Sequence, residues 1–393
     1  MPTATQQIPE EWRVVKISDL CEVLSGSTPK TSEKEYWNGN IPWFTPLDLS
    51  KISTRYVRKS ARQITDKGFS ACSAKKIPPR SLIMSSRAPI GYFAINLEEA
   101  TTNQGCKTFV CSEHLNVDFL YYYLNQFIDQ VKRLGSGSTF AEVGKKHLEG
   151  LKITIPPIAE QKAIARILSK VDEEIEKVDQ IIQRTEKLKK GLMQKLLSKG
   201  IGHKKFKKTE LGEIPEEWEV VTLENFIELS YGSNLPKRKR EEGEVPVYGS
   251  NGVTDRHNTA LVKGPGIIIG RKGSIGQVHW SESDFWPIDT TYYVTEEKEK
   301  EKNKNIRWIY YKFQTLGLEA MNSASGIPGL NRNEVYNLKI SVPPLPEQIK
   351  IVEILETVDK KLKINRKNKS KLNRLKKGLM ADLLSGKVRT CIN

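Results

Sequence analysis

An internal repeat is the feature of this sequence that most restricts its fold, because it requires two related halves within one chain. The pentapeptide IPEEW at residues 8–12 recurs letter for letter at 214–218, an offset of 206 residues. Two further motifs recur with an offset of 187 residues: PPIAEQ at 156–161 returns as PPLPEQ at 343–348, and KKGLM occurs at 189–193 and 376–380. A length of 393 residues suits two domains of ordinary size.

The middle regions of the two halves differ in length. GNIP at 39–42 corresponds to GEVP at 243–246, and RAPIG at 87–91 corresponds to RKGSIG at 271–276. The order of the motifs is the same in both halves, while the offset falls from 206 to 187 residues, so the first half has the longer middle region. A common scaffold with a divergent middle predicts two modules of different specificity.

The first part of each half is expected to be an α+β domain. GIIIG at 266–270 and ITI at 153–155 are short β-branched runs bounded by turn residues, a pattern typical of strands. Residues 117–134 and 305–318 place Tyr, Leu and Phe at helical spacing. Strands and helices are therefore mixed within each domain.

The second part of each half is expected to be a long helix with an apolar heptad seam. The seam residues are Ile164, Leu168, Val171, Ile175, Val178 and Ile182 in the first half, and Ile351, Leu355, Val358 and Leu362 in the second. Asn365 and Lys369 interrupt the second seam, and Leu372, Leu375, Leu379 and Leu383 resume it. A helix of about 39 residues, roughly 58 Å long, cannot bury such a stripe alone. Antiparallel pairing of the two helices is the simplest solution, and an ordinary bundle or an oligomerisation helix is the alternative.

These patterns divide the chain into five segments. Proline before each helix, glutamate in its first turn and Ser/Gly after its last turn mark the helix ends. The predicted segments are a first domain at 1–157, a central helix at 158–199, a second domain at 200–342, a C-terminal helix at 343–386 and a tail at 387–393.

The charge balance favours a polyanionic partner. The chain has 63 Lys and Arg residues against 47 Asp and Glu residues, a net charge of +16 and a pI near 9.4. Such a balance is common in nucleic-acid-binding proteins, although a soluble lysine-rich surface is the alternative explanation.

Composition also limits membrane, secretion and metal roles. No stretch approaches the roughly 20 apolar residues of a membrane helix, and residues 1–12 lack the features of a signal peptide, so we expect a cytoplasmic protein without membrane contact. The cysteines form no CxxC pair, and none of the five histidines makes a helical ligand pair with another. We therefore expect core thiols and no metal site. The cysteines are Cys21, Cys72, Cys106, Cys111 and Cys391.

With these motifs in their duplicated order, nearly the whole chain resembles the specificity subunits of Type I restriction-modification systems. The family-like features are the IPxxW entries, GSTP at 26–29 with IPW at 41–43, the segments 87–91 and 271–276, Asn103-Gln104, PPxxEQ and KKGLM. The second half departs from the pattern, with Tyr231–Asn234 in place of GSTP and 289–291 (DTT) near the position of Asn103-Gln104.

The resemblance implies a division of labour. Each domain would read one half of a bipartite site in double-stranded DNA, while the paired helices would fix the spacer and bind two adenine-N6 methyltransferase subunits. ATP-driven restriction subunits would join this core. By the same resemblance this chain carries no cofactor, and S-adenosylmethionine, ATP and Mg are expected on the partner subunits.

The sequence also lacks the motifs that catalysis would need. The double prolines at 78–79, 156–157 and 343–344 have no Asn/Asp before them and no aromatic residue after them, unlike an adenine methyltransferase motif. The glycine clusters at 135–137 and 264–266 complete neither a dinucleotide fingerprint nor a P-loop. We therefore expect a noncatalytic subunit, with no catalytic residues.

DNA reading requires donors and acceptors for base edges and cations for phosphates. On residue type and loop position, the predicted DNA-binding residues are Ser27, Thr28, Lys30, Ser86, Arg87 and Gln104 in the first half, and Lys237, Arg238, Tyr248, Asn251, Arg271 and Lys272 in the second. The alternative is structural: Arg87 and Arg271 would pair with acidic neighbours, Ser27 and Asn251 would shape turns, and 237–240 would be a solvated loop. The basic segment 199–208 would line DNA or act as a linker.

The sequence is also compatible with two other classes of function. A coiled-coil protein with duplicated protein-binding modules would use its charge only for solubility, and its binding would respond weakly to salt. A stand-alone modification enzyme would have to bind S-adenosylmethionine itself.

Overall fold

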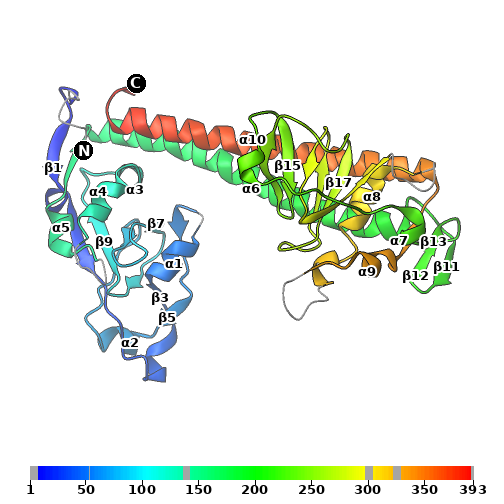
Figure 1. The fold of residues 1–393 in the computed structure, drawn as a ribbon. Coiled ribbons are helices and arrows are strands. Elements are labelled where there is room, and N and C mark those ends of the chain that lie inside the picture. The colour runs from blue at the N-terminus through cyan, green and yellow to red at the C-terminus, as the bar shows by residue number, and fades with distance from the viewer. Residues whose placement is uncertain (1–7, 53, 136–141, 297–303, 322–328, 391–393) are drawn as a thin grey trace. The chain divides into compact units, whose positions relative to one another are not determined.

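The computed structural model describes residues 8–52, 54–135, 142–296, 304–321 and 329–390. It separates into two compact units, one formed by 1–179 with 368–393 and the other by 180–367. We call these the first unit and the second unit. Each combines one α+β domain with part of both long helices, α6 (Ile158–Lys199) and α10 (Leu345–Leu384) (Figure 1).

The first unit contains a five-stranded sheet in the order β2-β9-β6-β7-β4, a three-stranded sheet β5-β3-β8 and the antiparallel pair β1-β10. In the three-stranded sheet, β3 runs parallel to β8 and antiparallel to β5. The elements are β1 (Arg13–Lys16), β2 (Cys21–Ser25), β3 (Trp37–Phe44), α1 (Pro46–Lys51), β4 (Tyr56–Val57), β5 (Arg62–Ile64), α2 (Asp66–Ser70), β6 (Leu82–Ser85), β7 (Phe93–Asn96), β8 (Thr101–Thr102), β9 (Cys106–Cys111), α3 (Val117–Gln126), α4 (Ile128–Arg133), α5 (Lys145–Glu149) and β10 (Lys152–Ile155).

Among the described residues, the second unit repeats this topology without a strand equivalent to β4. The sheet β14-β20-β17-β18 corresponds to β2-β9-β6-β7, the sheet β16-β15-β19 to β5-β3-β8, and the pair β13-β21 to β1-β10, while β11-β12 is an additional hairpin. The elements are β11 (Phe206–Thr209), β12 (Gly212–Pro215), β13 (Glu219–Thr222), α7 (Leu223–Phe226), β14 (Ser230–Tyr231), β15 (Val245–Gly249), β16 (Gly252–His257), β17 (Gly266–Gly270), β18 (Val278–Ser281), β19 (Trp286–Pro287), β20 (Thr291–Thr295), α8 (Ile306–Phe313), α9 (Arg332–Tyr336) and β21 (Lys339–Val342).

The two long helices run antiparallel within each unit (Figure 1). In the first unit Lys376 Nζ lies 2.6 Å from Asp172 Oδ1, and Lys369 Nζ lies 2.5 Å from Asp179 Oδ1. Residue numbers therefore decrease along α10 in the direction in which they increase along α6. In the second unit the same ordering joins Lys189 Nζ to Asp359 Oδ1 at 2.6 Å and Arg366 Nη2 to Glu186 Oε1 at 2.7 Å. The predicted α+β domains followed by antiparallel helices are thus confirmed.

The apolar seam is buried most deeply next to the domains. Of the predicted seam residues, Ile164, Leu168, Ile182, Ile351, Leu355 and Leu362 are buried, whereas Val171, Ile175, Val178 and Val358 are half-buried. Leu375 was expected to continue the second stripe, but it is 50% exposed. The helix interface is therefore narrower along this part of α10 than the heptad pattern suggests.

Each domain core is closed by two leucines from the end of the other half's helix. Leu383 and Leu384 of α10 belong to the core of the first unit, together with Trp12. Leu196 and Leu197 of α6 belong to the core of the second unit, together with Trp218. The end of each helix therefore stabilises the domain of the other half.

The thiols are free among the cysteines that the structure describes. Cys21 and Cys106 are buried, whereas Cys72 and Cys111 are half-buried, so only part of the set consists of core thiols. Cys391 lies outside the described residues. None of the helices described is both long and apolar enough to cross a membrane.

Candidate DNA-reading surfaces and the motifs that hold them

Backbone hydrogen bonds align the two domains residue by residue. Ser27 N donates to Thr102 O, as Ser233 N donates to Pro287 O. The turn that contains Gln104 follows the parallel strand pair β3/β8, and the turn that contains Asp289 follows β15/β19. Gln104 and Asp289 thus occupy equivalent positions.

This alignment corrects one motif match made from the letters alone. Gly91 N donates to Ser85 O, and Gly276 N donates to Gly270 O, so the shared Ile-Gly is correctly matched. The residues after these two acceptors must then correspond in order. Arg87 is equivalent to Lys272, and Arg271 is equivalent to Ser86. The sequence match paired Arg87 with Arg271 because it followed the identity of the letter across a loop of different composition.

Four predicted DNA-binding residues lie close together in the first unit. Thr28 Oγ1 donates to Gln104 Oε1, which joins the loop after β2 to the turn after β8. Indole nitrogens hold the same loop, with Trp43 Nε1 donating to Ser27 O at 2.9 Å and Trp37 Nε1 donating to Lys30 O at 3.2 Å. Lys30 and Gln104 are exposed, whereas Ser27 and Thr28 are half-buried. The loop is thus fixed from beneath with polar groups on its outer side.

Arg87 and Ser86 have structural partners. Arg87 Nε donates to Glu142 Oε2 at 2.8 Å, and the buried Lys107 donates to Glu142 Oε1 at 3.2 Å. Partial burial acts to raise the pKa of the Glu142 carboxyl, but the hydrogen bonds from the two cations outweigh it and lower that pKa. Ser86 is completely buried, and its hydroxyl donates to Gly105 O at 3.0 Å. Ser86 therefore shapes the loop from inside, and its side chain is not part of the exposed surface.

In the second unit the predicted residues separate into exposed and buried groups. Tyr248 is 7% exposed, and its hydroxyl donates to Trp280 O at 3.2 Å, so it belongs to the core and not to a reading surface. Lys237 and Arg238 are exposed on a short 3-10 helix, and Asn251 is exposed in the turn between β15 and β16. Lys272 is also exposed.

Arg271 lies in an aromatic setting that the sequence did not indicate. Its Nη1 donates to Asp289 O at 3.0 Å, and its guanidinium lies 5.0 Å from the ring centroid of Tyr231 and 5.9 Å from that of Tyr292. The guanidinium of Arg332, at the start of α9, lies 4.9 Å from the ring of Tyr231. Tyr231 was noted in the sequence only as a departure from the first half, and Arg332 was not noted at all.

The IPEEW and PPxxEQ motifs form one structural unit in each half. Trp12 Nε1 donates to Glu160 Oε2 at 3.2 Å, and Trp218 Nε1 donates to Glu347 Oε2 at 2.9 Å. A third segment completes each contact. Arg389, which follows α10, donates Nε and Nη2 to Glu160 at 2.8 and 2.9 Å, whereas His203, which follows α6, lies 2.8 Å from Glu347 Oε1 through its Nε2. We call these two arrangements the Trp-Glu clasps.

The glutamine of PPxxEQ binds the N-terminus of one helix within each domain, α3 in the first unit and α8 in the second. Gln161 Oε1 accepts from Asn116 N at 2.8 Å, and Asn116 caps α3 by accepting from Phe119 N. Gln348 Oε1 accepts from Asn305 N at 3.0 Å, and Asn305 caps α8 in the same way. The Glu and the Gln of PPxxEQ therefore bind different partners: the Glu binds the tryptophan of IPEEW, and the Gln binds the start of a domain helix. These two contacts explain why the motif is repeated.

A tyrosine–aspartate–lysine contact fastens each domain to both long helices. Tyr122 on α3 donates to Asp172 Oδ2 at 2.6 Å, and Asp172 also accepts from Lys376 of α10. In the second unit Tyr311 on α8 donates to Asp359 Oδ2 at 2.8 Å, and Asp359 pairs with Lys189 of α6. One carboxylate in each unit therefore joins three helices. These are α3, α6 and α10 in the first unit, and α8, α10 and α6 in the second.

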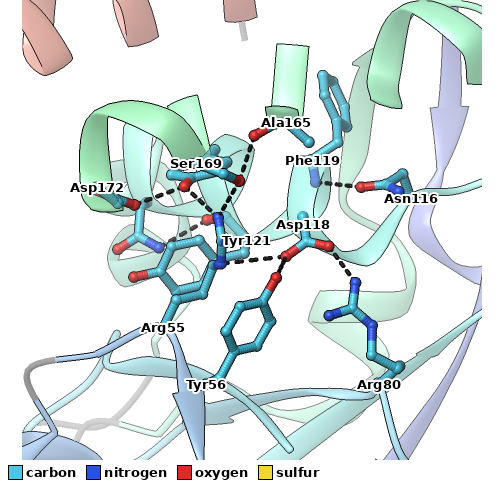
Figure 2. A network of polar contacts seen from close by, with 12 residues as sticks. Arg55, Tyr56, Arg80, Asn116, Asp118, Phe119, Tyr121, Ala165, Ser169 and Asp172 are labelled. Atoms are coloured by element: carbon cyan, nitrogen blue, oxygen red, sulfur yellow. Dashed lines mark hydrogen bonds and ion pairs between the residues drawn. The ribbon is translucent and has the colours of Figure 1, made fainter. Parts of the chain in front are cut away.

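The first unit extends this contact into a larger polar network. Arg55 Nη1 donates to Ser169 Oγ at 2.7 Å, while Arg55 Nε lies 3.3 Å from Asp118 Oδ1. Tyr56 OH donates to the same carboxylate at 2.6 Å, and Arg80 also pairs with it. Figure 2 shows Arg55 between Asp118 on one side and Ser169 and Asp172 on the other. The network orients α3 against α6.

The second unit contains a buried lysine at the end of α6. Lys312 is 9% exposed, and its Nζ donates to Leu197 O at 2.9 Å in the last turn of that helix. A cation suits the negative end of a helix dipole. Burial nevertheless lowers the pKa of Lys312 to about 8.

This shift predicts a pH-dependent stability. Below pH 8 the amine is charged in both the folded and the unfolded chain, so the burial penalty is constant there. Between about pH 8 and pH 10.5 the folded state loses the proton first, and the free energy of unfolding rises by roughly 3 kcal/mol. Urea unfolding over this range checks the rise. Lys312→Met should lack it and the exposed control Lys339→Met should retain it; equal pH slopes in all three proteins would contradict the assignment.

Comparison with known proteins identifies the family. The family described as "Type I restriction modification DNA specificity domain" matches residues 9–187 and 215–374, which together make up most of the chain. The chain belongs to this family. The specificity subunit is 29% identical to the "Type I restriction enzyme MjaIX specificity subunit" of Methanocaldococcus jannaschii, over 98% of this chain and 95% of that protein. It is 26% identical to the EcoprrI specificity subunit of Escherichia coli, over 89% and 87%.

Solved structures support the fold of the specificity subunit. The S subunit of a Type I restriction-modification system from M. genitalium matches with a TM-score of 0.67 at 20% sequence identity, over 98% of this chain and 97% of that one. A second structure, from work on assembly of a type I R-M system, matches with a TM-score of 0.54 at 18% identity. The resemblance predicted from the motifs is confirmed, and as a specificity subunit the chain is the noncatalytic, DNA-specifying component.

Among the described residues of the specificity subunit, no group of three or more His, Cys, Asp or Glu side chains is arranged to hold a metal ion. The exposed polar side chains described above are hydrogen-bond donors and acceptors, cations and a tyrosine ring, which are groups of the types that contact the bases and phosphates of nucleic acids.

Proposed function

We propose that the chain reads a bipartite site in double-stranded DNA, with one half-site per domain and a spacer set by the helix pair. The observation that carries this proposal is the duplication itself: two domains of the same topology lie in one chain, and each is fastened to both α6 and α10. The same scaffold presents different side chains at equivalent positions, such as Gln104 and Asp289. Because of that difference, the two domains are expected to recognise different half-sites.

The proposed DNA-contacting sets exclude the two buried side chains, Ser86 and Tyr248. They consist of Ser27, Thr28, Lys30, Arg87 and Gln104 in the first unit, and Lys237, Arg238, Asn251, Arg271 and Lys272 in the second. The amide and hydroxyl groups are suited to base edges and the exposed lysines to phosphates. Arg87 has to exchange part of its contact with Glu142 for DNA, so it is expected to contribute less than Arg271.

We further propose that the helices recruit two adenine methyltransferase subunits, to which restriction subunits are added. Both helices expose apolar side chains that an aqueous surface does not require: Ile167, Ile181, Leu188, Ile354, Ile364 and Leu375. In this proposal S-adenosylmethionine, ATP and Mg act on the partner subunits, and the complex works in the cytoplasm, where its DNA is found. The half-exposed heptad residues Val171, Ile175, Val178 and Val358 lie on the same pair of helices.

The salt dependence of DNA binding distinguishes this function from a protein-binding role. With six or more phosphate contacts, affinity for duplex DNA should fall by about 10³-fold between 50 and 200 mM salt, because bound counterions are released. A fluorescence titration of duplex DNA with the complex of this chain and its methyltransferase subunit, at each salt concentration, measures this fall. An affinity that barely changes with salt, or no binding to duplex DNA at 50 mM salt, would favour duplicated protein-binding modules instead.

A further inference from the structure

One exposed tyrosine of the second unit lies close to two arginines. Tyr231, at the end of β14, is 48% exposed. The guanidinium of Arg271 lies 5.0 Å from its ring centroid and that of Arg332 lies 4.9 Å from it. The three side chains come from three separate segments of the chain, so the fold brings them together. We call this cluster the Arg-Tyr-Arg stack.

The stack holds its guanidinium groups in place without neutralising them. Arg271 is anchored through Nη1 to Asp289 O, and Tyr292 lies against Tyr231 with ring centroids 5.1 Å apart. Within the described part of the chain, neither arginine forms an ion pair, and Nε of Arg332 is buried without a hydrogen-bond partner. Guanidinium groups that stack on an aromatic ring keep their N–H edges free for another acceptor.

The domain of the first unit has a different set of groups at the equivalent positions. Ser25 corresponds to Tyr231 and Ser86 to Arg271 by the alignment given above. Val143 N donates to Ser86 O as Leu330 N donates to Arg271 O, which makes Lys145 equivalent to Arg332. Glu142 forms ion pairs with the nearby Arg87 and Lys107, at 2.8 and 3.2 Å. The cluster is therefore a property of the second domain alone, as expected of a group that sets its particular half-site.

Arginine edges of this kind have one preferred base. A guanidinium donates two parallel hydrogen bonds to O6 and N7 of guanine in the major groove, which no other base accepts in the same way. Flexible exposed cations are sufficient for phosphate contact, and Lys272, Lys237 and Arg238 already supply them. Fixing two long side chains against a ring lowers the entropy cost of a directional contact, which is useful for a base edge and not for a diffuse charge.

We propose that the Arg-Tyr-Arg stack reads guanine in the half-site of the second domain, with Arg271 and Arg332 donating to the O6/N7 edge. Tyr231 acts as a positioning residue whose ring supports both guanidinium groups. This inference rests on the proposed function, since it requires that the second domain contacts duplex DNA through this face.

Arg→Lys variants test the inference, because lysine keeps the positive charge but cannot donate the two parallel hydrogen bonds of a guanidinium group. R271K and R332K, each co-expressed with the methyltransferase subunit, are compared with R366K, in which an exposed arginine of α10 is changed. The adenine-methylation motif of each complex is mapped first. Binding is then measured to duplexes in which each guanine of the motif is replaced in turn by 7-deazaguanine, which lacks N7 but keeps base pairing and phosphates.

The expected result is a loss of discrimination at defined guanines. For the wild type and R366K, 7-deazaguanine at one or two positions should weaken binding roughly 5- to 150-fold. R271K and R332K should each be insensitive at one of these positions while the other half-site keeps its preference, which shows that the complex is folded.

Two results would overturn the inference and leave the proposed function intact. One is a bipartite motif without guanine in either half-site. The other is an equal loss of affinity for all duplexes in R271K and R332K, with a smaller salt slope and unchanged base preference, which is the signature of phosphate contacts. A complex that forms but methylates at no defined motif would instead overturn the proposed function and the inference together.

Discussion

Removing one heptad from each long helix should shorten the gap in the recognised DNA site by about three base pairs. In the first unit Asp179 of α6 forms an ion pair with Lys369 of α10, so the heptads that contain these two residues, 175–181 and 367–373, are the ones removed together. Their joint deletion shortens each helix by about 10 Å while the apolar seam stays in register. At 3.4 Å per base pair this equals roughly three base pairs. Three base pairs also turn the duplex by roughly 100°, so weaker binding at the new gap is expected.

A matched control separates helix length from the lost ion pair. The double variant Asp179→Asn with Lys369→Gln removes that ion pair and leaves the length unchanged, so its gap should equal that of the wild type. Methylation motifs mapped for the three proteins supply the comparison. If the deletion variant methylates sites with the original gap, the helices do not set the spacer.

Glu160→Ala should lower the free energy of unfolding of the first unit by about 3 kcal/mol. Glu160 is fully buried and accepts hydrogen bonds from Trp12 and from Arg389. Its removal leaves a buried indole N–H without an acceptor and releases the tail that follows α10. Urea unfolding measures the loss of stability. Hydrogen exchange at the indole N–H of Trp12 in the native protein measures the loss of its acceptor.

Glu11→Ala is the matched control, because the same arginine also donates to Glu11 at 2.8 Å. Glu11 is 65% exposed, and exposed ion pairs contribute little, so this variant should lose less than about 0.5 kcal/mol. Equal losses in the two variants would mean that the clasp acts only as a surface ion pair and that the buried Trp12 contact contributes nothing.

The sequence predicted those features that repeat or have a regular period. The duplication, the mixed α+β domains and the antiparallel helices followed from the matched motifs and the heptad spacing, and the structure and comparisons bear them out. Periodicity reports which face of a helix is apolar, but it does not report how completely a neighbour covers that face. Leu375 shows this limit, since it continues the pattern and is half exposed.

The residues that the sequence misplaced all depend on contacts between distant segments. Ser86 and Tyr248 have side chains typical of DNA-binding residues, yet each is buried and donates to a backbone carbonyl, 19 and 32 residues further along the chain. Letter identity paired Arg87 with Arg271, whereas backbone hydrogen bonds place Lys272 opposite Arg87. Arg332 carried no local signal, because its significance comes only from its position over Tyr231. The repeated Glu of PPxxEQ was visible as a motif, but its bond to a tryptophan more than 100 residues away was not.

The most direct test of the proposed function is a map of modified adenines. The chain and the methyltransferase subunit encoded beside it are co-expressed in a host without adenine methylation, and the methylated positions are located by single-molecule sequencing. We expect one motif of two short defined elements separated by a fixed number of unspecified bases, and its loss when this chain is omitted. The same motif without the chain, or a complex that methylates a single uninterrupted element, would contradict a bipartite reading by two domains.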